Sequence, residues 1–280
     1  YHRTTIFFDK LEQIFLYINQ NQKNTIKSTE IFDIFKSNKR VLYLLFEKQI
    51  IIADDCIIEM IMSMEDSNQL KMSHFLYKHI KKFISDQKRI QIEAEITQEF
   101  NEKIETFEDK CHLGENDSYI CSLIRQDSIE EFVSFVNRTN LSLLSTIEPS
   151  IYETNSFLLD KRPSLIEYSA FYGSLQIIQY LRYNKVKLTE SLWIYSIHSK
   201  NAELIHFLEE NKIIQNTKQF EKVLKESIKC HHNDICKYIK NNLIPQIKDD
   251  ENENGMSHKF DSCILQHLNY FYFPNNISYI

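Results

Sequence analysis

The chain has 280 residues, of which 42% are hydrophobic and 26% charged, and its net charge is −6. It contains only 3 glycines and 4 prolines, which excludes a glycine-rich phosphate loop, a dinucleotide-binding fingerprint and a nucleophile elbow, because each needs clustered glycines. The same scarcity predicts an all-α chain, since few positions can adopt tight β-turns. No apolar run approaches the roughly 18–20 residues that span a bilayer, so we expect no membrane segment.

Residues 1–112 are predicted to form a helical N-terminal region. Apolar residues recur every three or four positions at 7–18 and at 92–107, and the second stripe predicts one long helix that ends before Gly114. Residues 29–55 are expected to form one atypical repeat, because the apolar positions between Ile34 and Ile50 match those between Ile197 and Ile213 at a constant offset. The chain begins at Tyr1 and not at Met, so we expect its true N-terminus to lie further upstream.

Residues 113–247 repeat the same pattern three times, starting at Ser169, Ser196 and Ser227. Each copy predicts a first helix with small residues, a turn, and a second helix that ends in a large aliphatic residue. The turn residues are Gly173, Lys200 and His231, and the final aliphatic residues are Leu181, Leu208 and Ile239. A period near 30 residues with two short helices per unit is typical of an ankyrin-like α-solenoid of degenerate helix-turn-helix repeats.

Two further segments complete the predicted organisation. Residues 141–163 lack periodicity and predict a long loop between repeats. Residues 248–258 are acidic and predict a linker, and residues 259–280 predict the start of a further repeat. Solenoids need capped ends and no polar cap precedes Ile280, so we expect more repeats after it.

Several phrases resemble those of one family. These are GENDSYIC at 114–121, STIEPS at 145–150, ETNSFL at 153–158, ESIKCHHNDI at 226–235 and YFPN at 272–275. They are similar to phrases of the large family of trichomonad ankyrin-repeat proteins, which carry an ankyrin-like domain of unknown function. The resemblance implies a helical N-terminal region followed by degenerate repeats, and it implies no reaction and no catalytic residue. The usual Thr-Pro-Leu-His phrase is replaced by Ser164 to Glu167, so we expect stacked helix pairs without regular β-hairpin fingers.

One group of side chains suggests metal chemistry. Cys230, His231 and His232 are followed by Cys236, which lies four residues after His232 and can share a helix face with it. A zinc site needs four ligands, or three and a water. Further candidates, His258, Cys263 and His267, lie beyond the predicted linker. In the repeat register the two histidines belong to an interhelical turn and Cys236 is a core residue, so a structural interpretation stands beside the chemical one.

Residues just before the interhelical turns of such repeats usually face the surface that binds a partner. Exposed Tyr, Trp and Arg residues are enriched at binding hot spots. We therefore predict six partner-binding residues: Phe171, Tyr172, His198, Lys229, Lys161 and Arg162. Phe171 and Tyr172 can alternatively be core residues, and Trp193 is expected to be buried.

These patterns predict a non-enzymatic protein–protein interaction module or scaffold in the cytoplasm, for example an architectural part of a cytoskeletal assembly. We expect other proteins as partners, no cofactor, no metal and no small-molecule substrate. One alternative is a metal-dependent or hydrolytic enzyme that uses the Cys/His group. Another is weak nucleic-acid binding through 78–89, which holds Lys78, Lys81, Lys82, Lys88 and Arg89. A solvated helix face is the simpler account of that run, because its charges are interrupted by apolar residues.

Overall fold

The computed structural model describes residues 13–14, 16–17, 27–64, 71–159, 161–214 and 217–244. All regular secondary structure in these residues is helical, and their β-type pairing is limited to one isolated antiparallel bridge between Thr146 and Ser164. The predicted all-α class is therefore confirmed for this part of the chain. None of its helices has the length and apolar character needed to cross a membrane. The predicted segments 248–258 and 259–280, and most of the predicted helix at 7–18, lie outside the described residues.

The chain divides into two compact units. Unit 1 consists of Tyr1–Asp117 and Glu148–Lys161, and unit 2 consists of Ser118–Ile147 and Arg162–Ile280. The chain thus leaves unit 1 after Asp117, returns to it for one loop, and leaves it again after Lys161. The predicted inter-repeat loop at 141–163 is shared between the two units.

The described part of unit 1 is built from helices of 4 to 15 residues, three of which begin at a polar capping side chain. The helices within its described residues from 27 onward are α2 (Ser28–Phe35), α3 (Lys39–Glu47), α4 (Asp55–Ser63), α5 (Met72–Phe75), α6 (Tyr77–Ile80), α7 (Asp86–Phe100) and α8 (Ile104–Leu113). The side chains of Asn38, Asp54 and Ser85 accept a hydrogen bond from a first-turn N–H of α3, α4 and α7 respectively. These caps satisfy amide groups that have no partner within the helix.

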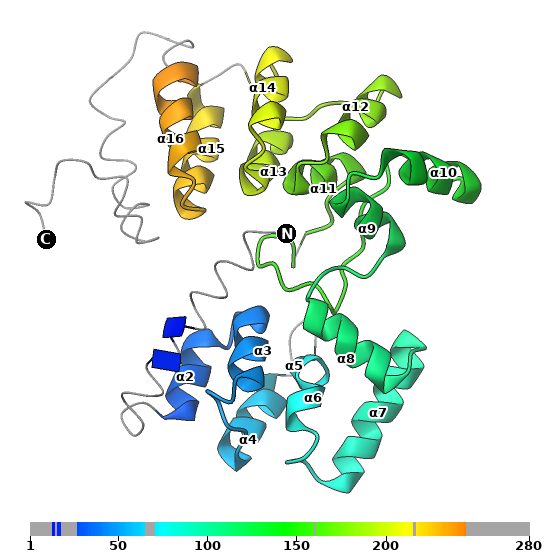
Figure 1. Ribbon diagram of the computed structural model, residues 1–280, viewed down its shortest axis with the longest axis vertical. Coiled ribbons are helices and arrows are strands. Elements are labelled where there is room, and N and C mark those ends of the chain that lie inside the picture. The colour runs from blue at the N-terminus through cyan, green and yellow to red at the C-terminus, as the bar shows by residue number, and fades with distance from the viewer. Residues whose placement is uncertain are drawn as a thin grey trace, which may run out of the picture. The chain divides into compact units, whose positions relative to one another are not determined.

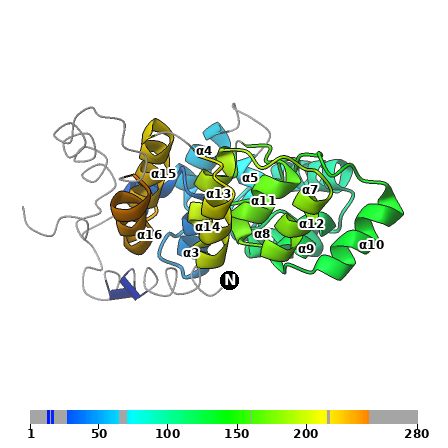
Figure 2. The ribbon, with the colours of Figure 1, turned by 90° about the horizontal axis from the view of Figure 1, so that it is seen from above.

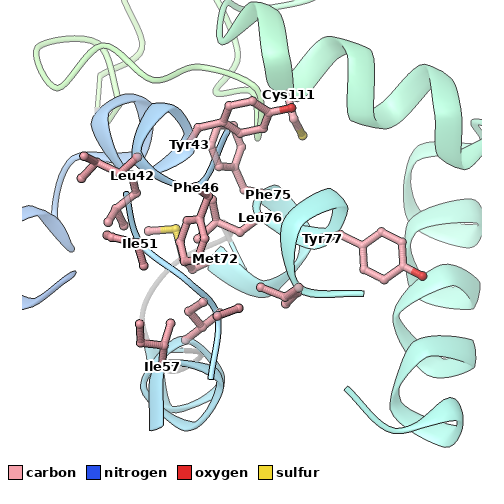
Figure 3. Packing of buried hydrophobic residues seen from close by; sticks show 14 of the residues in the cluster. Leu42, Tyr43, Phe46, Ile51, Ile57, Met72, Phe75, Leu76, Tyr77 and Cys111 are labelled. Carbon is pink, nitrogen blue, oxygen red and sulfur yellow. The ribbon is translucent and has the colours of Figure 1, made fainter. Parts of the chain in front are cut away.

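Aromatic rings form the centre of the unit 1 core. Tyr43 of α3 meets Phe75 of α5 edge to face, with ring centroids 5.7 Å apart, and Figure 3 shows Cys111 of α8 beside them. The returning loop completes this core, because Tyr152 is buried and its ring lies 5.3 Å from that of Phe107. The loop is therefore a structural part of unit 1.

The prediction of a single helix over 92–107 was wrong, because this segment belongs to two helices, α7 and α8. Asn101 adopts a left-handed conformation with φ of 51°, which ends α7 and begins the connection to α8. The two helices contact each other, and the rings of Phe100 and Phe107 lie 5.2 Å apart. A helical hairpin keeps the same three- or four-residue spacing on each arm, so the apolar pattern alone does not reveal the break.

Up to Ile244, the last residue that the structure describes, unit 2 contains four consecutive helix pairs. They are α9 (Tyr119–Arg125) with α10 (Ile129–Thr139), α11 (Leu165–Tyr172) with α12 (Leu175–Tyr183), α13 (Ser191–Ser199) with α14 (Ala202–Glu210), and α15 (Thr217–Lys229) with α16 (Asn233–Tyr238), which continues into the π-helical segment η2 (Ile239–Leu243). The first helices pack in a row, since α11 contacts both α9 and α13, and α13 contacts α15. Figures 1 and 2 show the pairs in the same order.

The turns between paired helices share one backbone conformation. The predicted turn residues Gly173, Lys200 and His231 have φ of 77°, 53° and 55°, and Asp127 between α9 and α10 has φ of 50°. Each donates its N–H to the carbonyl three residues earlier, as His231 does to Ile228. The predicted register is therefore confirmed at the turns, and the α9–α10 pair follows it as well.

The predicted packing positions are buried in the structure. Ser169, Ser196 and Ser227 are completely buried, and each hydroxyl donates to a carbonyl of its own helix at 2.7–2.8 Å. A small side chain with a satisfied hydroxyl lets neighbouring first helices approach closely without leaving a polar group unpaired. Trp193 and Cys236 are buried as predicted, with exposed fractions of 1% and 0%.

We expect Gly173→Ala to lower the free energy of unfolding of unit 2 by about 1–3 kcal/mol. An added Cβ would lie 3.0 Å from Cβ of Ser199 and 3.1 Å from Cβ of Asn201, at a left-handed φ that alanine disfavours. Urea unfolding followed by the fluorescence of Trp193, the single tryptophan of the chain, measures the change.

Lys200→Ala is the matched control, because Lys200 occupies the equivalent turn and already carries a Cβ at positive φ. It should leave the urea midpoint almost unchanged. Equal midpoints for Gly173→Ala and the unmodified protein would contradict the expectation.

Candidate functional site

The residues that precede the turns form a continuous strip across α11, α13 and α15. Phe171 contacts Tyr172, and its ring also stacks on the imidazole of His198 with centroids 5.0 Å apart and an interplanar angle of 27°. His198 Nε2 lies 3.1 Å from Oε1 of Glu226. That oxygen lies 3.6 Å from Nζ of Lys229. We call the set of Phe171, Tyr172, His198, Glu226, Lys229 and Cys230 the turn-edge strip.

Members of the strip differ in accessibility. Phe171 is only 7% exposed, so it packs against the neighbouring side chains and contributes little accessible surface to the strip. Tyr172 is half-buried, and the side chains of His198 and Lys229 are 14% and 49% exposed. A partner that approached the strip would meet Tyr172 and Lys229 first.

The other two predicted binding residues belong to the loop that returns from unit 1. Lys161 is the last residue of unit 1, and its Nζ lies 3.0 Å from the centroid of the Phe157 ring. Arg162 is exposed and is the first residue after the crossing into unit 2. The structure thus brings together four of the predicted residues, Phe171, Tyr172, His198 and Lys229, on the turn-edge strip.

The predicted Cys/His group is replaced by a different one. His231 occupies the turn between α15 and α16, and Cys236 is fully buried in the core. Cys230 instead lies beside His198 of the preceding helix pair, with Sγ 3.6 Å from its Nδ1, and Sγ is also 3.8 Å from Oε1 of Glu226 on α15. Ligand-type atoms of these three residues all lie within 4.8 Å of one another.

Glu226 was missed by the sequence reasoning, although a signal for it was present. Residues four apart on a helix lie on the same face, so the side chain of Glu226 is expected to lie next to that of Cys230. The equivalent position in the two preceding pairs is held by Tyr168 and Tyr195, and both are buried. A carboxylate at that position therefore distinguishes the α15–α16 pair from the two pairs before it.

The electrostatics of Cys230 disfavour nucleophilic chemistry. Burial, followed by the negative charge of Glu226, raises the pKa of the thiol to about 12, and Lys229 opposes this shift only in part. A Cys–His–carboxylate arrangement is the geometry of a thiol nucleophile, but an activated thiol has a lowered pKa. The raised pKa therefore favours a neutral thiol that takes part in a hydrogen-bonded cluster with His198 and Glu226.

The basic run at 78–89 is partly neutralised within unit 1. Lys81 Nζ lies 2.7 Å from Oε1 of Glu108, and the guanidinium of Arg89 lies 2.7 Å from Oδ1 of Asp86. Ion pairs of this kind reduce the positive charge available to phosphates. The geometry therefore adds no support to nucleic-acid binding.

In the part of the chain that the structure describes, the fold is all-α, and the second unit is a row of helix pairs with equivalent turns. No family model, no curated protein and no solved structure matches this chain.

Proposed function

We propose that unit 2 is an ankyrin-like α-solenoid that acts as a non-enzymatic protein-interaction module, and that the turn-edge strip is its recognition surface. The repeat period, the shared left-handed turns and the buried serine column support the solenoid assignment. The proposal agrees with the resemblance to trichomonad ankyrin-repeat proteins. A cytoplasmic scaffold role, in an assembly such as the cytoskeleton, belongs to the same proposal.

The observation that carries this proposal is the continuity of the strip. Side chains from three successive first helices touch one another in sequence, from Tyr172 through His198 to Lys229. Repeat proteins bind with surfaces built from equivalent positions of adjacent repeats. Tyr172 offers an aromatic face and Lys229 an ammonium, so the surface suits a protein segment that carries apolar and acidic side chains.

Affinity capture from native cell extract, followed by mass spectrometry and a titration with the captured partner, tests the proposal. We expect Tyr172→Ala combined with Lys229→Ala to weaken the binding of a specific partner at least tenfold, because loss of a hot-spot residue costs more than about 1 kcal/mol. Tyr183→Ala is the matched control, since Tyr183 is 83% exposed at the end of α12 and lies outside the strip. Equal partner binding by the double variant and the unmodified protein would refute the recognition role of the strip.

A further inference from the structure

Three potential metal ligands of different chemical types converge between two successive helix pairs. His198 belongs to α13, whereas Glu226 lies on α15 and Cys230 immediately follows that helix. Nε2 of His198 lies 3.1 Å from Oε1 of Glu226 and 3.9 Å from Sγ of Cys230, and Sγ lies 3.8 Å from Oε1. The three atoms therefore form a triangle with sides of 3.1, 3.8 and 3.9 Å.

This triangle has the dimensions of one face of a tetrahedral zinc centre. Ordinary zinc bonds, about 2.3 Å to sulfur and about 2.0–2.2 Å to nitrogen or oxygen, place tetrahedral ligands roughly 3.4–3.6 Å apart. Each separation in the structure would have to change by only about 0.4 Å or less to reach that range. The imidazole would also have to turn so that Nε2 points at the ion, because Sγ of Cys230 lies 3.6 Å from Nδ1 and 3.9 Å from Nε2. The donor set of thiolate, imidazole and carboxylate is one that Zn²⁺ accepts in proteins.

We propose that His198, Glu226 and Cys230 bind Zn²⁺ through three protein ligands, with water at the fourth position. Phe171 stacks on the imidazole and covers one of its faces. The side chains of His198 and Glu226 are 14% and 16% exposed, so an ion can reach them from solvent. The site joins α13 to α15 and therefore links two neighbouring repeats.

Binding involves two local exchanges. The thiol of Cys230 releases one proton to solvent as its sulfur becomes a thiolate ligand. The ammonium of Lys229, now 3.6 Å from Oε1 of Glu226, gives up this contact to the metal. Removal of the lysine charge is therefore expected to preserve or strengthen metal binding, which separates this proposal from partner recognition by the same strip.

Titration of the metal-stripped, reduced chain with Co²⁺ and then with Zn²⁺ tests the site directly. We expect one Co²⁺ per chain, with thiolate-to-cobalt charge-transfer absorption and the intense visible bands of four-coordinate cobalt, both removed by one equivalent of Zn²⁺. Cys230→Ser and Glu226→Gln should each weaken Zn²⁺ binding at least tenfold, measured by chelator competition. Zn²⁺ should also raise the midpoint of unit 2 unfolding followed by Trp193 fluorescence, because it binds only the folded site.

Cys56→Ser is the matched control, because it removes an exposed thiol far along the chain from the site. This variant and Lys229→Ala should retain the charge-transfer absorption. Circular dichroism of each variant verifies that the helices remain folded. The proposal is overturned if cobalt shows no thiolate absorption, or if Cys230→Ser binds Zn²⁺ as tightly as the unmodified chain.

Discussion

Leu181→Ala is expected to lower the free energy of unfolding of unit 2 by about 2–5 kcal/mol. Leu181 lies near the end of α12 and is completely buried. Its helix contacts both α11 of the same pair and α10 of the preceding pair. Truncation removes the apolar side chain and leaves a cavity that the packed helices around it can fill only in part.

Urea unfolding monitored by the fluorescence of Trp193 measures this loss. Trp193 is buried in α13 and is the only tryptophan, so its signal reports unit 2. Tyr183→Ala, two residues further along the same helix, is the matched control, because that ring is 83% exposed. A loss below about 1 kcal/mol for Leu181→Ala would show that the α12 end is not packed as the structure describes.

Lys39→Met is expected to raise the free energy of unfolding of unit 1 at pH 7 by about 1–3 kcal/mol. Lys39 is 5% exposed, and its Nζ lies 5.2 Å from the centroid of the Phe75 ring, with no hydrogen-bond partner. Burial lowers the pKa of this ammonium to about 8, although the charge of Glu153 opposes the shift. A methionine of similar shape would remove the cost of burying the charge and keep the apolar contacts.

The lowered pKa of Lys39 also predicts how the free energy of unfolding changes with pH. The folded pKa of about 8 lies below the ordinary value of 10.5, so the unfolded chain binds more protons between these values. The contribution of Lys39 to the free energy of unfolding therefore rises as pH increases from about 8 to about 10.5, and is constant and unfavourable below that window.

Urea unfolding of the unmodified protein and of Lys39→Met, followed by far-ultraviolet circular dichroism at pH 7, 9 and 10.5, measures the contribution of Lys39 to the free energy of unfolding. The stability advantage of the variant should shrink as the pH rises. Lys36→Met is the control, because Lys36 is exposed and paired with Asp33 at 3.1 Å. An advantage that stays constant with pH, or a destabilised variant, would show that the ammonium of Lys39 is not penalised by burial.

Much of unit 2 was predictable from the sequence because its determinants are local and repeated. The backbone at Gly173, Lys200 and His231 turns in the same way. Each turn is set by the residues on either side of it. The core positions of Trp193 and Cys236 followed from the same alignment, since equivalent residues in stacked repeats face equivalent neighbours.

The tertiary structure alone decided the features that depend on contacts between distant residues. The break at Asn101 is invisible in the apolar period, because two facing helices show the same spacing as one. Tyr152 lies in the unit 1 core because the segment Glu148–Lys161 returns to unit 1 after the first helix pair of unit 2.

The site shows the same division between local and distant determinants. Periodicity along one helix pairs Glu226 with Cys230, but it contains no information about which side chain of another helix will face them. His198 joins them because α13 and α15 pack side by side, which brings its imidazole within 3.1 Å of the Glu226 carboxylate. The sequence by itself therefore determined the helix pairs of unit 2 and their turns. The packing of one helix pair on the next determined the cluster, since side chains from different helices converge only where those helices meet.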